Sequence, residues 1–391
     1  MKILLYTCLN CYFSVYIYDL SYIFYKNITG DNTTARRMTS SERMAALISG
    51  QKPDRVPVVP FVEGYSSNIT GISLGDFYAD GDKCFEAQFA SMRLHGYEQT
   101  PMYGYASCGA WEFGGKIEFP YRKGQGAPYV TEHPVKTIED IEKLEVPDFE
   151  KELPGAYKIA DRVAARCFEL GMPVTVQTGS NFTAASVVAD TSEFLTWLIM
   201  EPKAVHLLLD KVSDMFINAL DYFANKYGSE SLLPFDGGPS ESNNMIPPQM
   251  FEEFAYPYMK KVHTHVKELG INAMLMHPCA DQNQNIPYYR KLREELNWSG
   301  KYFWLFGPET SIKEQIKAFG EHDVICGNIN PTLFLTSSYE ELLEICRQNI
   351  EEGMKSPSGY ILSPGCEFPV NAPPVKLMAM IDAAEKYGRY E

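Results

Sequence analysis

The chain has 391 residues, enough to bury a large core as one large barrel or as two domains of ordinary size. Its formal net charge of -15 excludes a surface that wraps nucleic acid by neutralising phosphates. The nine cysteines are odd in number and irregularly spaced, which argues against a disulfide framework and indicates a reducing, cytoplasmic compartment.

Residues 1–37 differ in character from the rest of the chain. The segment 3–25 is rich in Leu, Ile, Tyr and Phe, but Asn10 and Asp19 interrupt it. It is too broken for a secretory signal peptide, and Asp19 is costly in a membrane span. Cys8 and Cys11 form a C-x-x-C with no second pair nearby, which is a weak metal motif. We interpret residues 1–37 as a disordered or spuriously translated N-terminal extension, with a membrane tether as the alternative, and expect the folded protein to begin at Met38.

From Met38 onward, predicted helices and strands alternate. Short apolar runs bounded by Gly, Pro or Asp predict strands, and apolar residues at helical spacing predict helices. Pro234 lies inside one apolar run, where it cannot donate to a strand ladder. The predicted strands are 56–62, 102–105, 174–178, 232–235, 272–276, 302–306, 323–325 and 359–362. The predicted helices include 40–47, 82–94, 137–144, 154–170, 184–200, 202–225 and 247–269.

Eight strands separated by helices predict an α/β fold, a single (β/α)8 TIM barrel over residues 38–391. A doubly wound sheet is the alternative. The chain has no G-x-G-x-x-G after a predicted strand and no Walker-type phosphate loop, which argues against a Rossmann dehydrogenase and a P-loop enzyme. The glycine-rich stretch 109–126 predicts an excursion or lid over the barrel.

A histidine and three cysteines follow predicted strands, and residues that follow barrel strands face one mouth. His277 and Cys279 come after the fifth strand, which Pro278 ends. Imidazole nitrogen and thiolate sulfur are the ligands that zinc prefers, although a packed histidine beside a buried thiol is the plainer alternative. Cys326 and Cys366 follow the seventh and eighth strands, so all four side chains are candidates for one metal site.

Other polar and glycine residues also follow predicted strands. Carboxylates at such positions are candidates for a base, a ligand or a substrate anchor, and glycine or amide groups for cofactor contacts. The candidate catalytic carboxylates are Glu63, Asp236 and Glu309. The candidate cofactor-binding residues are Gly179, Asn181 and Asn328.

Four segments of the chain resemble the uroporphyrinogen decarboxylase superfamily. They are residues 40–43 (SSER), 53–58 (PDRVPV), 327–331 (GNINP) and 359–366 (GYILSPGC). The resemblance covers roughly residues 38–390 and implies a single (β/α)8 barrel. True decarboxylases of this family carry an arginine-rich segment after the first strand, whereas residues 60–68 (PFVEGYSSN) contain no arginine. A tetrapyrrole with many carboxylates would be poorly bound by such a loop.

The resemblance is closer to the family's other branch, the zinc-dependent methyltransferases that work with corrinoid proteins. Their metal motif is His-x-Cys followed by a cysteine on the last strand, which His277, Cys279 and Cys366 match. Cys326 precedes Cys366 by 366 − 326 = 40 positions, a spacing similar to the zinc motif of some aryl-ether demethylating members. Whether Cys326 replaces His277 or Cys279 as a ligand, or only neighbours the site, stays open at this point.

The resemblance therefore implies a zinc-dependent methyltransferase. It would exchange a methyl group between a small substrate, either a thiol acceptor or an aryl methyl ether donor as in O-demethylases, and a corrinoid. Because the chain lacks the Asp-x-His-x-x-Gly mark of a cobalamin-binding module, the corrinoid is expected on a separate protein that docks at the barrel mouth. The aromatic-rich stretch 103–119 slightly favours the ether. We expect no nucleic-acid or membrane partner and allow for a homodimer. The alternatives are a metal-free porphyrinogen decarboxylase and a catalytically silent binding subunit.

Overall fold

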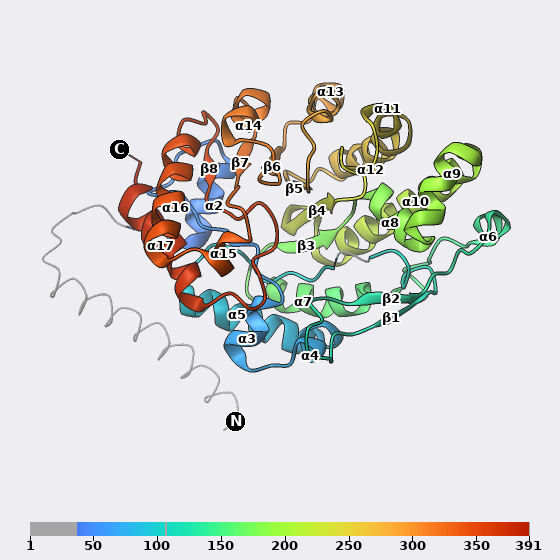
Figure 1. The fold of residues 1–391 in the computed structure, drawn as a ribbon, viewed down its shortest axis with the longest axis horizontal. Coiled ribbons are helices and arrows are strands. Elements are labelled where there is room, and N and C mark those ends of the chain that lie inside the picture. The colour runs from blue at the N-terminus through green and yellow to red at the C-terminus, as the bar shows by residue number, and fades with distance from the viewer. Residues whose placement is uncertain (1–36, 106–107, 391) are drawn as a thin grey trace, which may run out of the picture. The chain divides into compact units, whose positions relative to one another are not determined.

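Parallel strands form the centre of the fold (Figure 1). The computed structural model describes residues 37–105 and 108–390, and the residues from Thr39 onward form one compact unit. Within these residues, a six-stranded sheet pairs in the order β3-β4-β5-β6-β7-β8, with each strand parallel to the next. This sequential order, with helices between the strands, is the predicted (β/α)8 pattern. The strands are β3 (Val174–Gln177), β4 (Leu232–Gly238), β5 (Ala273–Pro278), β6 (Lys301–Leu305), β7 (Val324–Cys326) and β8 (Tyr360–Ile361).

The first two strand positions of the barrel, called staves below, are the segments 56–62 and 102–105, and both are irregular. The predicted strand 56–62 joins the end of β8 through an isolated parallel bridge between Val58 and Leu362. On its other side, the Val58 carbonyl accepts a hydrogen bond from the Glu98 backbone N–H at 2.9 Å. The prediction of a regular strand at 102–105 is wrong, because the Met102 N–H donates to the Gln88 side chain at 3.1 Å and the Met102 carbonyl accepts from the same amide at 2.6 Å. A side chain thus replaces the strand neighbour, and these two segments complete the eight staves.

A buried charge cluster holds the first stave in place. The Glu98 carboxylate accepts hydrogen bonds from Arg43 Nη1 at 2.8 Å, Arg55 Nη2 at 2.9 Å and the Val58 backbone N–H at 2.7 Å. Arg43 also pairs with Asp54 at 2.6 Å. Buried charges are tolerated when they are paired and hydrogen-bonded in this way. The segments 40–43 and 53–58, which carry part of the family resemblance, therefore anchor the first stave to its neighbours.

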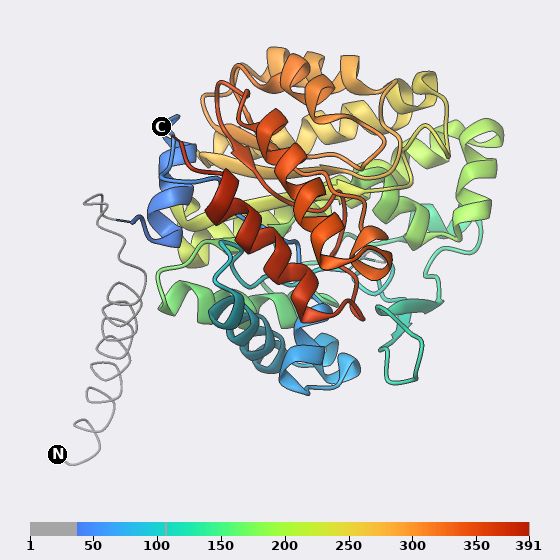
Figure 2. The same ribbon diagram turned by 60° about the vertical axis from the view of Figure 1, so that its left-hand side comes forward.

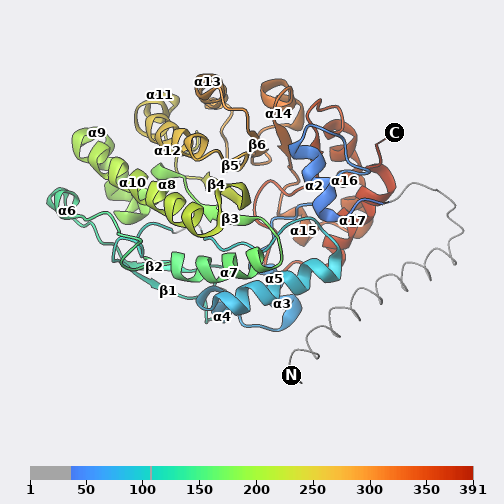
Figure 3. The same ribbon diagram turned by 180° about the vertical axis from the view of Figure 1, so that it is seen from behind.

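Helices surround the strands on the outside of the barrel. α5 and α7 lie side by side in the view from behind (Figure 3). The first helices in the chain are α2 (Ser40–Ile48), α3 (Tyr65–Thr70), α4 (Leu74–Ala79), α5 (Gly81–His95), α6 (Ile138–Lys143), α7 (Tyr157–Glu169), α8 (Asn181–Val188), α9 (Thr191–Met200) and α10 (Pro202–Tyr227). The later helices are α11 (Pro248–Met250), α12 (Tyr256–Glu268), α13 (Ile286–Leu296), α14 (Ile312–Phe319), α15 (Leu333–Thr336), α16 (Tyr339–Gly353) and α17 (Pro374–Tyr387).

Two predicted helices are interrupted in the structure. The predicted helix 184–200 divides into α8 and α9, because Ala189 has an extended backbone and the Asp190 side chain accepts hydrogen bonds from the backbone N–H groups of Ser192 and Glu193. An aspartate that binds the first free N–H groups in this way begins a new helix. The predicted helix 247–269 contains a π-helical turn, Phe251–Ala255, between α11 and α12.

An antiparallel hairpin occupies the region of the predicted excursion. Its strands are β1 (Lys116–Glu118) and β2 (Tyr129–Glu132). The hairpin projects from the rest of this unit beside the barrel (Figure 2). Its side chains are half-buried or exposed, so it contributes little to the core.

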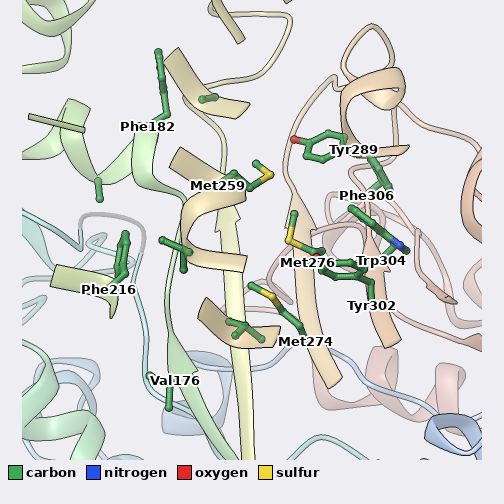
Figure 4. Packing of buried hydrophobic residues seen from close by; sticks show 14 of the residues in the cluster. Val176, Phe182, Phe216, Met259, Met274, Met276, Tyr289, Tyr302, Trp304 and Phe306 are labelled. Carbon is green, nitrogen blue, oxygen red and sulfur yellow. The ribbon is translucent and has the colours of Figure 1, made fainter. Parts of the chain in front are cut away.

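The main core lies between the outer face of the strands and the helices. Side chains alternate along each strand, so Met274 and Met276 of β5 and Tyr302 and Trp304 of β6 point outward and pack together (Figure 4). Trp304 stacks on Phe319 of α14 with ring centroids 4.2 Å apart. The alternate positions point into the barrel. In the part of the chain that the structure describes, no helix has both the length and the apolar character needed to cross a membrane.

Candidate metal centre

His277 lies near the carboxyl end of β5 with its ring on the inner side of the barrel wall. Its Nδ1–H donates to the Leu305 carbonyl of β6 at 2.7 Å. This bond leaves the other ring nitrogen, Nε2, as the lone-pair atom. Nε2 is buried and has no hydrogen-bond partner of acceptable geometry among the described residues. A buried polar atom without a partner is costly, and a metal ion would satisfy it.

Two thiols complete a cluster around this nitrogen. Cys279 follows β5 and Cys366 follows β8, and their sulfur atoms are 3.7 Å apart. Together with His277 they offer three ligand atoms within 4.8 Å of one another. The sulfur separation is far longer than a disulfide bond of about 2.05 Å. Two sulfurs bound to one tetrahedral zinc ion at about 2.3 Å lie roughly 3.8 Å apart, so the spacing fits zinc.

The electrostatics of the cluster favour one thiolate. The hydrogen bond from Cys279, with further stabilisation from His277, lowers the pKa of Cys366 to about 4 despite burial. The pKa of Cys279 is correspondingly raised, because its thiol donates to the Cys366 sulfur. Burial lowers the pKa of His277, but Cys366, the Leu305 carbonyl and Glu241 together raise it overall. Thiolate sulfur is the form that binds a metal.

The three side chains line a cavity of about 220 Å³ at the barrel mouth, called the mouth pocket below. Glu63 and Glu367 also line it, and the Glu367 carboxylate accepts from the Gly64 backbone N–H at 3.2 Å. Burial and then the neighbouring Glu367 raise the pKa of Glu63, and burial raises the pKa of Glu367 to about 7. Of the predicted carboxylates, Glu63 is therefore the one beside the cluster. Glu367 was not predicted, although its position next to Cys366 was a usable signal.

Asp236 does not face the mouth pocket. It lies on β4 between the inward-facing Phe235 and Gly237, so its carboxylate points toward the helices. There it accepts from His263 Nε2 at 2.8 Å, and His263 Nδ1 is 2.9 Å from the Tyr302 hydroxyl. The structure therefore places Asp236 in a buried hydrogen-bond network behind the wall of the site, which does not favour the predicted catalytic role.

The remaining candidates divide between the pocket wall and its supports. Gly179 lines the mouth pocket. Asn181 turns away from it, and its Nδ2 donates to Ser213 at 2.8 Å. The Asn328 side chain donates to the Gly307 carbonyl at 3.1 Å and so ties the loop after β7 to the loop after β6. Glu309 is exposed at the rim of the barrel. Of these four residues, only Gly179 lines the mouth pocket in the described part of the chain.

Cys326 is separated from the cluster. Its side chain packs inside the barrel with apolar neighbours that include Phe303 and Ile361. Burial raises the pKa of the Cys326 thiol, which keeps it neutral. The grouping of potential metal ligands among the described residues contains His277, Cys279 and Cys366 without Cys326. The three-residue set is the one that the geometry supports.

A parallel (β/α)8 barrel with polar side chains converging at the carboxyl ends of its strands defines an enzyme-type barrel. The chain belongs to the uroporphyrinogen decarboxylase family, because the family model "Uroporphyrinogen decarboxylase (URO-D)" matches residues 39–387. The fold agrees with that of a solved methyltransferase from Methanosarcina mazei, with a TM-score of 0.74 and 18% identity over 90% of this chain and 99% of the other. This likeness confirms the predicted TIM barrel.

Curated relatives carry two kinds of name. The methylcobamide:CoM methyltransferase MtbA of Methanosarcina acetivorans is 24% identical over 353 residues, which cover 89% of this chain and 98% of the relative. MtbA of Methanosarcina mazei is 23% identical over 352 residues, with the same coverage. The uroporphyrinogen decarboxylase of Bacillus cereus is 26% identical over 244 residues, which cover 60% of this chain and 64% of the relative.

Proposed function

We propose that this protein is a zinc-dependent methyltransferase that exchanges a methyl group between a small substrate and a corrinoid on a separate protein. The observation that carries the proposal is the cluster of His277, Cys279 and Cys366, with an unpartnered imidazole nitrogen and two sulfurs at the spacing of a tetrahedral zinc site. Three protein ligands leave the fourth position open for a substrate.

The relatives support this branch of the family. The two relatives named methylcobamide:CoM methyltransferase align over nearly their whole length, whereas the decarboxylase aligns over about two thirds of its own. Their names describe a methylated corrinoid and a thiol, coenzyme M. A thiol acceptor is therefore the first substrate class to test, with an aryl methyl ether donor as the second.

The residues of the cluster have distinct roles under this proposal. Cys279 and Cys366 supply sulfur ligands, and the Leu305 carbonyl orients the His277 ring so that Nε2 faces the same point. Zinc held by these residues would act as a Lewis acid, lowering the pKa of a substrate thiol or drawing charge from an ether oxygen. We assign to Glu63, which lines the same pocket, the role of taking up the proton that a substrate thiol loses.

The decarboxylase alternative fits the pocket poorly. A porphyrinogen with many carboxylates needs cationic side chains around it. Among the described residues, the lining of the mouth pocket contains no lysine or arginine and includes the carboxylates of Glu63 and Glu367. The segment 60–68, at the end of the first stave, likewise has no arginine.

Metal analysis of the purified protein and four alanine variants tests the proposal. We expect stoichiometric zinc in the wild type and in Cys326→Ala, and loss of most of it in His277→Ala, Cys279→Ala and Cys366→Ala, because each removes one of three ligands. Methyl transfer from a methylated corrinoid protein to a thiol should fall with the zinc content.

Three results would contradict the assignment or the proposed function. Full zinc content in all three ligand variants would show that the metal binds elsewhere. Loss of zinc in Cys326→Ala but not in Cys279→Ala would move the site toward β7 and β8. A protein that holds no zinc and transfers no methyl group would instead be a silent binding subunit.

A further inference from the structure

A second cavity, of about 460 Å³, lies inside the barrel and is called the interior cavity below. Barrel interiors of this fold are ordinarily filled by layers of side chains. Here the inward-facing residues of the staves leave space between them. The wall is formed by apolar and small side chains from around the barrel, including Val59, Met102, Thr175, Leu233, Ala273 and Leu305.

The interior cavity runs along the barrel from the metal centre toward the amino-terminal ends of the strands. At one end it is lined by His277. At the other end it is lined by Ile48 and Phe168, which are 39% and 48% exposed, and by residues of the loop before β3. Because these outer residues reach solvent, the cavity approaches the surface on the face opposite the mouth pocket.

Three aromatic rings separate the two cavities. Phe61, Phe235 and His277 line both of them. The Phe61 ring centroid lies 5.8 Å from that of Phe235 and 5.4 Å from that of His277, in edge-to-face contacts. Phe61 has φ of 49°, a left-handed conformation that is uncommon for a bulky residue and is found mainly where surrounding structure imposes it. The ring thus forms a partition directly beside the metal centre.

The wall of the interior cavity offers no partner to a charged ligand. Among the described residues, no lysine or arginine lines it. One of its two carboxylates, Glu98, is already bound by Arg43 and Arg55, and the other, Glu230, is exposed at the outer end. A charged ligand would lose its hydration inside without gaining a partner, whereas an apolar one gains from leaving water.

We propose that the interior cavity binds an uncharged, mainly apolar small molecule of about the size of a substituted benzene ring. An apolar cavity of about 150 Å³ already accommodates benzene, so this cavity has room for a ring with substituents. Binding there places the ligand against the Phe61, Phe235 and His277 partition. The partition separates such a ligand from Cys279 and Cys366, so this site is distinct from the one assigned under the proposed function.

Calorimetric titration of the full-length protein with anisole tests this site. The assay needs no methyl transfer, no thiol and no corrinoid. We expect saturable binding to the wild type and at least about tenfold weaker binding to Ala273→Phe and to Leu233→Trp, which place a ring in the cavity from two different strands. Ala90→Phe is the matched control, because Ala90 is exposed on α5, and its affinity should equal that of the wild type. Thermal unfolding of each variant verifies that it is folded.

Benzoate, which has the same ring with a charge, should not bind. Absence of anisole binding to the wild type, or unchanged binding in both folded cavity variants, would overturn the proposal. Equal binding of benzoate would refute the inference that the ligand is uncharged. These outcomes are separate from the metal and methyl-transfer assays, so a protein without zinc that binds anisole refutes the proposed function alone.

Discussion

Replacing Glu98 by alanine should destabilise the protein strongly. The side chain of Glu98 is completely buried and bridges Arg43 at 2.8 Å and Arg55 at 2.9 Å, and it also accepts the Val58 backbone N–H at 2.7 Å. The variant leaves two buried guanidinium groups with fewer acceptors and one backbone donor without its acceptor. Removing one partner of a buried ionic cluster costs about 3–5 kcal/mol, so we expect the free energy of unfolding to fall by about that amount.

Urea denaturation measures this change through the midpoint of the transition at unchanged slope. Asp82→Ala is the matched control, because Asp82 also bridges two arginines, Arg162 at 2.8 Å and Arg166 at 3.0 Å, but at the surface. Surface ion pairs contribute less than about 1 kcal/mol. If the two variants lost the same stability, or if Glu98→Ala lost less than about 1 kcal/mol, burial would not be what makes the Glu98 cluster important.

Two further predictions concern Gly179 and Glu241, whose buried carboxylate accepts a hydrogen bond from the Thr183 hydroxyl at 2.9 Å. Gly179→Ala should cost about 1–3 kcal/mol, because a Cβ there would lie 2.3 Å from the Asp236 carboxyl carbon, whereas Gly126→Ala, with open space around it, should be nearly neutral in the same denaturation assay. Equal stability of the two variants would contradict the packing. Burial raises the pKa of Glu241 to about 7, so the folded state holds this proton more tightly than the unfolded chain, and its stabilising effect is lost as pH rises from about 4.5 to 7. The free energy of unfolding of the wild type should be roughly 2 kcal/mol lower at about pH 7.5 than at about pH 5, and Glu241→Gln should lack this decline. An identical pH profile in that variant would refute the assignment.

The six regular strands were predictable because each is a short apolar run between turn residues. The segment 102–105 looks the same in sequence, but its backbone partner is the Gln88 side chain. A local pattern reports that a segment is extended and buried, and it does not report which group satisfies the backbone. The break between α8 and α9 has the opposite explanation, since Asp190 is a recognisable cap that apolar residues on both sides obscured.

The cluster was predictable from where its residues fall. His277, Cys279 and Cys366 follow parallel strands, and parallel strands end at one mouth. Position after a strand does not, however, say which way a side chain points. Cys326 and Asp236 both lie at strand ends, yet Cys326 points into the apolar interior and Asp236 points toward the helices. Strand alternation contains that information, but an error of one residue in the register reverses it.

Residues 1–37, including the Cys8 and Cys11 pair, lie essentially outside the described part of the chain, so their interpretation as an extension stays a prediction. The same holds for a corrinoid protein partner, a homodimer and the choice between thiol and ether, which depend on molecules other than this chain.

The irregular staves give the two sides of the pocket unequal resistance to local opening. His277 and Cys279 extend from the backbone ladder of β4 to β6, whereas in the segment before Glu63 the backbone N–H groups of Val58 and Val62 donate to the side chains of Glu98 and Gln99. The amide protons of Val58 and Val62 should therefore exchange with solvent well before those of β5. Local opening of the barrel on the Glu63 side admits a substrate, while the three ligand atoms keep their spacing.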